Sequence, residues 1–251
     1  MSASMSASMS AQSSAEPAPS TSGTSIGHVA ELVRAAVPPM HPGGRPIVAG
    51  VAAGAALLRL VTGRGTIAGV AATAAVAAFF REPVRVPPTR TGIVVAPADG
   101  TVATVSEVEP VPELGLPAGP VPRVSVFLSV LDVHVQRVPV EGRVSAVEYR
   151  PGAFLSADLD KASEDNERNA VLFTTAEGQH VGVLQIAGLL ARRIVCQVKA
   201  GDEVAAGETF GLIRFGSRVD AYLPAGSRVL VAPGQRTIGG ETVLAELPDV
   251  R

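Results

Sequence analysis

The hydrophobic residues of this chain form two different patterns, which meet near residue 90. Residues 47–58 and 66–80 are uncharged, apolar and rich in alanine, and Arg59 and Arg64 flank the glycine-containing segment between them. Each run is shorter than the roughly 20 residues that a helix needs to cross a bilayer alone. The pattern therefore predicts two apolar helices joined by a short turn, which enter or lie on a membrane as a helical hairpin.

The flanks of this region favour a membrane hairpin over a pair of alanine-rich helices buried in a soluble core. Arg45 and Arg81 stand at its ends, where arginine side chains can reach lipid headgroups. Gly50 and Gly54 have the spacing that lets two helices approach closely. Since arginines also lie at the turn, the distribution of charge gives no orientation for the hairpin.

Beyond about Ile93 the apolar residues occur in short runs that alternate with glycine, proline and aspartate. Such closely spaced runs, rich in valine and isoleucine, are typical of antiparallel β domains. The predicted strands are Ile93–Val95, Thr101–Val105, Val124–Leu128, Val144–Tyr149, Ala170–Thr174, His180–Ile186, Arg193–Val198, Thr209–Ile213, Val229–Val231 and Thr242–Glu246. We therefore predict a mainly β chain, an antiparallel β-sandwich or hybrid-barrel-like domain with an N-terminal apolar helical membrane segment.

A short internal repeat lies in the β region. The segment 201–209 matches 234–242, with glycine at the first and seventh positions, then Glu-Thr and an apolar strand. Such turn-then-strand units recur in hybrid barrel-sandwich folds of the lipoyl and biotinyl type. One alternative is therefore a lipoyl- or biotinyl-like binding module. Against it, neither of the two lysines, Lys161 and Lys199, lies in a suitable turn between the repeat units.

Composition and charge exclude several other classes. The chain has 21 Lys and Arg against 23 Asp and Glu, a net charge of −2, and no basic block, so nucleic acid is not an expected partner. The single cysteine, Cys196, cannot form an internal disulfide. Of the four histidines, His28 and His41 precede the β region and His180 lies far from His134 along the chain. We therefore expect no metal site, because no ligand set has the right count.

The N-terminal segment differs in composition from the rest of the chain. Residues 1–25 repeat Met-Ser-Ala-Ser and continue through Ser, Ala, Pro, Thr and Gly, with Glu16 as the only charge. They lack the basic start and apolar stretch of a signal peptide. The predicted organisation is thus a disordered tail over 1–25, a helical membrane-associated region over 26–82, and a β-rich domain over 83–251.

Two segments of the β region carry a carboxylate or an imidazole in a suggestive setting. Asp99 lies on a Pro/Gly turn between two strands, where an aspartate commonly bonds its own backbone. In a strand, Asp132, His134 and Gln136 would share one face, so that a carboxylate could orient an imidazole. The alternative for His134 is a histidine that is simply hydrogen-bonded in the core.

A third segment contains the pair Gly216-Ser217. Alone, a Gly-Ser pair is usually only a turn. It is not a nucleophile elbow, because that pattern requires glycine two residues before and two after the serine, where this chain has Phe215 and Val219. A serine hydrolase of that type is therefore disfavoured.

Together these segments resemble the phosphatidylserine decarboxylase family, specifically its short, archaeal-type branch. The resemblance extends from about Val37 to Leu247 and rests on several strings in the expected order. These are Ala96-Pro-Ala-Asp99-Gly100, Phe127-Leu-Ser with Asp132-Val-His134, Lys161-Ala-Ser with Asn166-Glu-Arg-Asn169, Gln185-Ile-Ala-Gly188 with Ala191-Arg-Arg-Ile-Val-Cys196, and Arg214-Phe-Gly-Ser-Arg-Val-Asp220.

The resemblance implies an inactive proenzyme that cleaves its own Gly216–Ser217 bond and converts Ser217 into a pyruvoyl group. The products would be a β chain, residues 1–216, and an α chain, residues 217–251, which form a heterodimer that can oligomerise further. The covalent pyruvate does the work of pyridoxal phosphate, so neither that cofactor nor a metal is expected. The implied reaction is the decarboxylation of phosphatidylserine to phosphatidylethanolamine through a Schiff base.

The resemblance also implies roles for individual side chains. A serine hydroxyl needs a base within hydrogen-bond reach, and His134 is expected to be that base, with Asp99 orienting it. By chemistry alone, and not from the resemblance, the phosphate and carboxylate of the substrate make Arg168 and Arg193 candidate binding residues; the alternative for each is a surface charge. Longer family members carry a second histidine where Arg137 stands here. Either His134 therefore serves both self-cleavage and decarboxylation, or another group activates the serine.

The expected partners are phosphatidylserine and a membrane surface. The expected location is the cell membrane, on its cytoplasmic face, with the protein bound peripherally or through the hairpin. A second alternative function is a pyruvoyl decarboxylase of a soluble amino acid. The apolar region over 47–80 argues against it, because a water-soluble substrate requires no such hairpin.

Overall fold

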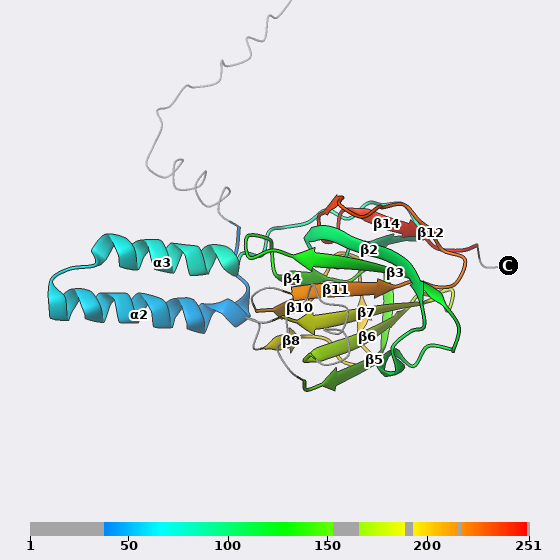
Figure 1. The fold of residues 1–251 in the computed structure, drawn as a ribbon, viewed down its shortest axis with the longest axis horizontal. Coiled ribbons are helices and arrows are strands. Elements are labelled where there is room, and N and C mark those ends of the chain that lie inside the picture. The colour runs from blue at the N-terminus through cyan, green and yellow to red at the C-terminus, as the bar shows by residue number, and fades with distance from the viewer. Residues whose placement is uncertain (1–37, 153–165, 189–192, 215–216, 250–251) are drawn as a thin grey trace, which may run out of the picture. The chain divides into compact units, whose positions relative to one another are not determined.

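Two helices precede a domain built of β-strands (Figure 1). The structure is a computed structural model that describes residues 38–152, 166–188, 193–214 and 217–249. The predicted tail over 1–25 lies outside the described residues. The helical elements are η1 (Pro42–Gly44), α2 (Arg45–Thr62), α3 (Thr66–Phe79) and η2 (Pro112–Leu114).

The predicted helical hairpin is present as α2 and α3. The chain reverses at Gly63 and Gly65, whose φ angles of 70° and 87° lie in the left-handed region that glycine adopts readily. No residue of α2 is buried, and α3 buries only Phe79, its last residue. One helix of the described chain, Pro42–Thr62, is long and apolar enough to cross a membrane, with a mean hydropathy of 1.4.

The close contact between the helices is not at the glycines that the spacing predicted. A Cβ added at Gly50 or Gly54 would meet no atom within 4 Å, so neither glycine lies against α3. At Gly69 an added Cβ would lie 2.7 Å from the Cβ of Ala55. The prediction for Gly50 and Gly54 was therefore wrong, because the small residues that let the helices approach are Ala55 and Gly69.

All ten predicted strands overlap strands of the structure. The described strands are β1 (Ile93–Val95), β2 (Gly100–Val108), β3 (Val121–Leu128), β4 (Val135–Arg137), β5 (Gly142–Arg150), β6 (Arg168–Thr174), β7 (His180–Ala187), β8 (Ile194–Cys196), β9 (Glu203–Val204), β10 (Thr209–Ile213), β11 (Ser217–Tyr222), β12 (Arg228–Val229), β13 (Arg236–Thr237) and β14 (Val243–Glu246). The sequence pattern missed β4, β9, β11 and β13.

The strands form one large sheet and two small ones. The order in the large sheet is β13-β2-β3-β11-β7-β6-β5-β9, and the small sheets are β1-β14-β12 and β4-β10-β8. Their pairings are antiparallel. One apolar core is shared by the sheets and includes Val126, Val183, Phe210, Val219 and Leu244. The predicted fold, a mainly antiparallel β chain with apolar helices near its N-terminus, is confirmed.

The central strand β11 carries buried charge, which explains why its pattern was not recognised. It lies between β3 and β7, and all of its residues are buried. Arg218 and Asp220 alternate with apolar residues and form a two-bond ion pair at 2.9 and 2.8 Å. Burying a charge is costly unless it is paired and hydrogen-bonded, and here each partner satisfies the other. A Val/Ile-rich strand pattern cannot find such a strand.

The repeated glycine turns have the same conformation in both copies. Gly201 and Gly234 have φ angles of 98° and 91°. The N–H of Gly201 donates to the carbonyl of Val144, and that of Gly234 donates to the carbonyl of Val102, both at 2.8 Å. The repeat seen in the sequence therefore has a structural basis, because each glycine turn is attached to a matching strand.

The strands that receive these turns are also related to each other by a second internal repeat. Residues 96–102 read Ala-Pro-Ala-Asp-Gly-Thr-Val, and residues 138–144 read Val-Pro-Val-Glu-Gly-Arg-Val. The segments bond each other reciprocally, because the N–H groups of Val95 and Arg137 each donate to the proline carbonyl of the other segment, at 2.9 and 2.8 Å. Similarly, β13 pairs with β2 as β9 pairs with β5. The β domain thus consists of two halves related by an approximate two-fold axis.

Candidate active site

Ser217 is the first residue of β11, at the centre of the large sheet. It is paired with Leu128 of β3 on one side and Ala187 of β7 on the other. Its side chain is fully buried, and its Oγ has no hydrogen-bond partner among the described residues. A buried hydroxyl without a partner is costly and calls for a functional explanation. Gly216, the other residue of the predicted cleavage bond, lies outside the described residues.

His134 comes from the connection that follows β3, directly before β4. It is fully buried, and its carbonyl accepts a hydrogen bond from the N–H of Ile213, the last residue of β10, at 3.1 Å. The connection from β3 to β4 therefore starts beside Ser217 and reaches His134 next to the end of β10. Since the chain continues from β10 into β11, the topology brings His134 and Ser217 to the same end of the domain.

The hydrogen bonding of the His134 ring leaves Nε2 as the available base. Nδ1 lies 2.9 Å from the carbonyl oxygen of Asp132. A carbonyl can only accept, so Nδ1 carries the proton and Nε2 has the lone pair. Nε2 is buried and has no partner among the described residues. Burial lowers the pKa of His134 to about 4, although the contact with Asp132 opposes the shift. The ring is therefore neutral at neutral pH, as a general base must be.

The end of the helical hairpin covers the imidazole. The ring of Phe79 in α3 lies on that of His134, with centroids 4.2 Å apart and planes tilted by 36°. Phe79 and Phe80 belong to a small buried cluster with Val133, Val135 and Leu212. This cluster joins the hairpin to the β domain and keeps water from one face of the imidazole, which explains why burial dominates its pKa.

A tight turn before His134 is closed by a carboxylate. Oδ2 of Asp132 accepts hydrogen bonds from the N–H of Ser129 at 2.8 Å and from its Oγ at 2.7 Å, and Arg236 forms an ion pair with Asp132. Burial alone would raise the pKa of Asp132, but the bonds from Arg236 and Ser129 outweigh burial and lower it. Asp132 therefore stays ionised and fixes the turn.

The prediction that Asp132 and His134 share a strand face was wrong. The strand begins only at Val135, and Asp132 lies in the turn before it. The backbone carbonyl of Asp132 orients the imidazole, while its carboxylate bonds Ser129 and Arg236. The residues around Asp132 form a turn instead of a strand because the N–H and hydroxyl of Ser129 give the carboxylate of Asp132 two local donors.

Asp99 lies on the turn between β1 and β2, held by two donors. Oδ2 accepts from Arg85 at 2.6 Å, and Oδ1 accepts from the N–H of Gly239 at 2.7 Å. Burial raises the pKa of Asp99, against the lowering effects of Gly239 and Arg85. In the described part of the chain no hydrogen bond joins Asp99 to the ring of His134, so its orienting role stays a prediction and must act through intervening backbone.

Arg137, at the position of the second histidine of longer family members, bonds to backbone. Its guanidinium donates to the carbonyls of Pro83 at 2.7 Å and Gly207 at 3.3 Å. Burial lowers its pKa, and the nearby carboxylates of Glu82 and Asp99 oppose the shift. Arg137 thus fastens the linker after α3 to one of the repeated glycine turns and remains a cation.

The two arginines predicted to bind substrate lie in different settings. Arg168 is buried, and its Nε donates to Glu113 at 2.8 Å. It pairs in register with Ile186, which pairs with Arg218, so alternation places Arg168 on the face of the sheet opposite to Ser217. Arg193 is exposed, and its carbonyl accepts from the N–H of Arg214 at the site end. The structure therefore places the backbone of Arg193, but not the side chain of Arg168, at the serine end, while the charge of Arg193 acts on Tyr149 of β5.

A chain of buried amides supports the strand that follows His134. Gln136 donates to the carbonyl of His134 at 2.8 Å, Gln185 donates to Gln136 at 2.9 Å, and Asn169 donates to Gln185 at 2.8 Å. Gln185 shares the face of the large sheet that Ser217 occupies, since it pairs with Val219. The amides thus join β4 to the sheet beside the serine. Gln185 and Asn169 lie in strings that carried the family resemblance, but their role could not be read from sequence.

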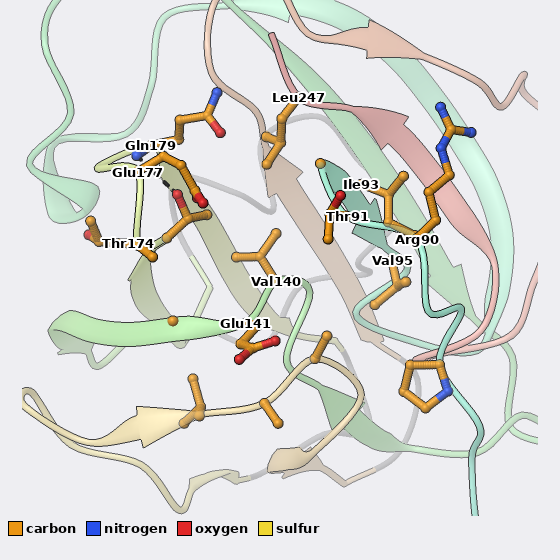
Figure 2. Close-up of a pocket in the computed structure, with 18 of the residues that line it drawn as sticks. Arg90, Thr91, Ile93, Val95, Val140, Glu141, Thr174, Glu177, Gln179 and Leu247 are labelled. Atoms are coloured by element: carbon orange, nitrogen blue, oxygen red, sulfur yellow. Dashed lines mark hydrogen bonds between the residues drawn. The ribbon is translucent and has the colours of Figure 1, made fainter. Parts of the chain in front are cut away.

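A cavity lies apart from these reactive groups. It has a volume of about 1130 Å³, and Glu141, Val95 and Gly92 are among the residues around it (Figure 2). None of Ser217, His134 and Asp99 lines it. Since the predicted reactive groups lie away from this cavity, they and not the cavity define the candidate site. Among the described residues no three His, Cys, Asp or Glu side chains gather as a metal site.

Comparison with known proteins identifies the family. The family model described as phosphatidylserine decarboxylase matches residues 72–245. The phosphatidylserine decarboxylase proenzyme of Saccharopolyspora erythraea is 63% identical over 229 residues, which cover 91% of this chain and 96% of the relative. The proenzymes of Rhodococcus jostii and Mycobacteroides abscessus are both 58% identical, over 235 and 233 residues, and cover 92% of this chain and 98% of each relative. The chain therefore belongs to the phosphatidylserine decarboxylase family.

Proposed function

We propose that this protein is a carboxy-lyase that matures by cleaving its own Gly216–Ser217 bond and then decarboxylates phosphatidylserine to phosphatidylethanolamine. One observation carries the proposal. The hydroxyl of Ser217 and Nε2 of His134 are both buried without a partner among the described residues. Ser217 begins β11 and His134 directly precedes β4, at the same end of the domain. Because relatives are named phosphatidylserine decarboxylase proenzymes, we assign self-cleavage and decarboxylation to Ser217 and His134.

Self-cleavage follows from the chemistry of the two groups. Nε2 of His134 accepts the hydroxyl proton of Ser217 as Oγ attacks the carbonyl carbon of Gly216. The peptide nitrogen then takes a proton and leaves as the amine of Ser217, so that an ester replaces the amide. Loss of the Cα proton expels the carboxylate of residue 216, and hydrolysis of the resulting enamine releases ammonia and leaves a ketone at position 217.

Burial at this site serves the reaction. The cover of Phe79 excludes water from one face of His134, and water would otherwise compete for the ester. It also keeps the imidazole neutral, because burial lowers the pKa of His134 to about 4. A protonated ring could not accept the serine proton.

In the mature enzyme, a pyruvoyl carbonyl at position 217 supplies an electron-accepting group for an amine-bearing carboxylate substrate. Position 217 fits such a group, since β11 holds it rigidly between β3 and β7 and no described residue bonds its side-chain oxygen. His134 would hold the proton that replaces the departing carbon dioxide. Arg193 is exposed at this end and would bind the phosphate or carboxylate of the headgroup.

Asp99 is proposed as a positioning residue. Its bonds to Arg85 and Gly239 fix the turn that contains Pro97. The carbonyl of Pro97 in turn accepts from the N–H of Arg137 in β4, at 2.8 Å. The carboxylate thereby holds the strand that begins directly after His134.

The cleaved chains should remain associated as a heterodimer. The α chain, residues 217–251, would contribute β11, β12, β13 and β14, and β11 is paired on both sides with strands of the β chain. We also place the enzyme at the cell membrane, on the cytoplasmic face. The exposed apolar hairpin supports a membrane location, because a soluble chain would gain stability by burying it.

Intact-mass measurement of the purified protein tests the proposal. The wild type should give two chains split between residues 216 and 217, the smaller without a free N-terminal amine, and should release carbon dioxide from phosphatidylserine. Ser217→Ala should stay uncleaved and inactive. Ser125→Ala, which removes another buried hydroxyl without a described partner, should cleave normally. An uncut 25.5 kDa chain in active material would refute the mechanism, and turnover of free serine but not of phosphatidylserine would favour a soluble substrate.

A further inference from the structure

Two adjacent apolar side chains stand in solvent next to the site. Val130 is 52% exposed and Leu131 is 83% exposed, as much as Leu60 on α2 at 82%. They form the tip of the connection between β3 and β4, which continues into His134. Single exposed apolar residues are common on soluble proteins, but two adjacent ones at one tip call for an explanation.

The tip is held rigidly. The carboxylate of Asp132 accepts from the N–H and hydroxyl of Ser129, and the N–H of Asp132 donates to the carbonyl of Ser129 at 2.9 Å. Arg236 pairs with Asp132 from the neighbouring strand β13. The bonds close the turn at both ends and leave Val130 and Leu131 projecting between them. Their exposure is therefore a property of a well-fixed turn.

The same tip is fastened to the base of the hairpin. Nη2 of Arg81, two residues after the end of α3, donates to the carbonyl of Leu131 at 2.6 Å. Phe79, at the end of α3, lies on His134. A surface that receives the hairpin would therefore meet Val130 and Leu131 as well.

Positive charge gathers around this tip, although the chain as a whole has a net charge of −2. The arginines placed here by their contacts or by the hairpin base are Arg45, Arg81, Arg214 and Arg236. Of the carboxylates beside them, Asp132 is buried and paired with Arg236, and Glu82 accepts a hydrogen bond from the hydroxyl of Thr209. An anionic lipid leaflet complements such a surface, since basic residues near the leaflet strengthen binding to it.

We propose that the Val130–Leu131 tip inserts into the headgroup region of an anionic phospholipid leaflet, beside the hairpin, so that the end of the domain with Ser217 and His134 faces the lipid. The inference rests on the proposed function for its substrate, while its evidence is the exposed tip, its bond to the hairpin base and the arginines. A lipid headgroup would then reach the serine without leaving the interface.

Depth-dependent quenching tests this placement. In a Cys196→Ala background, Leu131→Cys and Leu230→Cys each give a single thiol for a polarity-sensitive fluorophore. Leu230 is a matched control, an apolar residue 39% exposed that directly follows β12 of the small sheet β1-β14-β12. Each full-length protein is reconstituted into phosphatidylcholine vesicles that contain phosphatidylglycerol and a spin-labelled lipid. The label at 131 should be blue-shifted and quenched about two-fold, because interfacial side chains sit about 5–10 Å into the headgroup and acyl boundary, whereas the label at 230 should stay unquenched.

Equal quenching at the two positions would overturn the inference. Concentration-dependent shielding of position 131 in detergent, without quenching in vesicles, would assign the tip to a second copy of the chain and also overturn it. A denaturing gel of the same labelled samples separates this question from the proposed function. Cleaved, active protein with an unquenched label at 131 contradicts the inference alone, and a quenched label on protein that neither cleaves nor decarboxylates contradicts the proposed function alone.

Discussion

The two related halves of the β domain build the same framework at two ends and place reactive groups at only one. The alignment of residues 96–102 with 138–144, continued to the preceding residues, matches Asp99 to Glu141 and Gly92 to His134. The carbonyl of His134 accepts from the N–H of Ile213 at 3.1 Å, and the carbonyl of Gly92 accepts from that of Leu247 at 2.8 Å. The backbone is thus nearly repeated, while the side chains that it carries are not.

The surroundings of the two ends differ as much as the side chains. At the site end, Phe79 covers the imidazole and Arg85 holds Asp99. At the other end Glu141 is exposed beside the cavity of about 1130 Å³ in Figure 2. Phe79 and Arg85 belong to α3 and the linker after it, which are not part of the repeat. The repeat therefore supplies a rigid framework, and elements outside it make one end dry and reactive.

Removing the imidazole of His134 should have the largest effect on the reaction rates among these predictions. His134→Gln should slow self-cleavage about 10²-fold to 10⁴-fold, the usual contribution of a positioned general base, and the protein that does cleave should decarboxylate more slowly by a similar factor. His180→Gln, which changes an exposed histidine on β7, should leave the rate unchanged. Rates are measured as carbon dioxide released, and cleavage is followed by gel. Normal cleavage in His134→Gln would show that another group activates the serine, and normal decarboxylation would remove His134 from the mechanism.

Neutralising the two equivalent carboxylates compares the ends directly. Asp99→Asn should slow cleavage about 10-fold to 100-fold, because loosening the turn that supports β4 misplaces the base by a fraction of an ångström or more. Glu141→Gln should cleave at the wild-type rate, since Glu141 is exposed and far from the serine. The half-times of cleavage after synthesis measure both. Equal rates in the two variants would show that Asp99 has no greater role than its counterpart.

Equivalent glycine substitutions in the two repeated segments should destabilise the fold to the same extent. A Cβ at Gly100 would lie 2.3 Å from the carbonyl oxygen of Phe127, and a Cβ at Gly142 would lie 2.1 Å from that of Thr174. Gly100→Ala and Gly142→Ala should therefore each lower the free energy of unfolding by about 1–3 kcal/mol, as overpacking typically does. Urea unfolding in detergent measures both. A loss in only one variant would break the equivalence of the halves.

Acid should lower the free energy of unfolding through His134, at the end of the domain that holds the site. Burial holds the folded pKa at about 4, below the ordinary 6.5 of the unfolded chain. Between these pH values the imidazole takes up a proton in the unfolded chain but not in the folded one. The contribution of His134 to the free energy of unfolding is therefore full above pH 6.5 and is lost as the pH falls toward 4. It amounts to about 2 kcal/mol between pH 7 and pH 5. His134→Gln should remove that part of the pH dependence of urea unfolding, and His180→Gln should keep it. An identical pH dependence in wild type and His134→Gln would contradict the buried neutral imidazole.

Much of the fold could be predicted because it follows local rules. The uncharged runs around Arg59 and Arg64 predicted the hairpin, and Val/Ile-rich runs between turn residues predicted strands that the structure confirms. The strand β11 was missed because Arg218 and Asp220 break the apolar pattern and become acceptable only as a buried ion pair. Pairing of that kind depends on the complete sheet and has no local signal.

The residues of the candidate site also fall into those that the sequence could name and those that it could not. Ser217, His134 and Asp99 could be named from the strings that carry the family resemblance. The same strings gave no account of Phe79 on the imidazole, of Arg85 on Asp99, or of the amides that support β4. Their positions arise from contacts between segments far apart in the chain.

The sequence by itself determined the kinds of elements, the repeat of the glycine turns and the residues able to do the chemistry, because periodicity and motifs are properties of neighbours along the chain. Only the tertiary structure decided which glycine lies between the helices, that the carbonyl and not the carboxylate of Asp132 orients His134, and that Arg168 faces away from Ser217. The physical reason is burial. Whether a polar group is paired, ionised or left without a partner depends on what the completed fold packs against it.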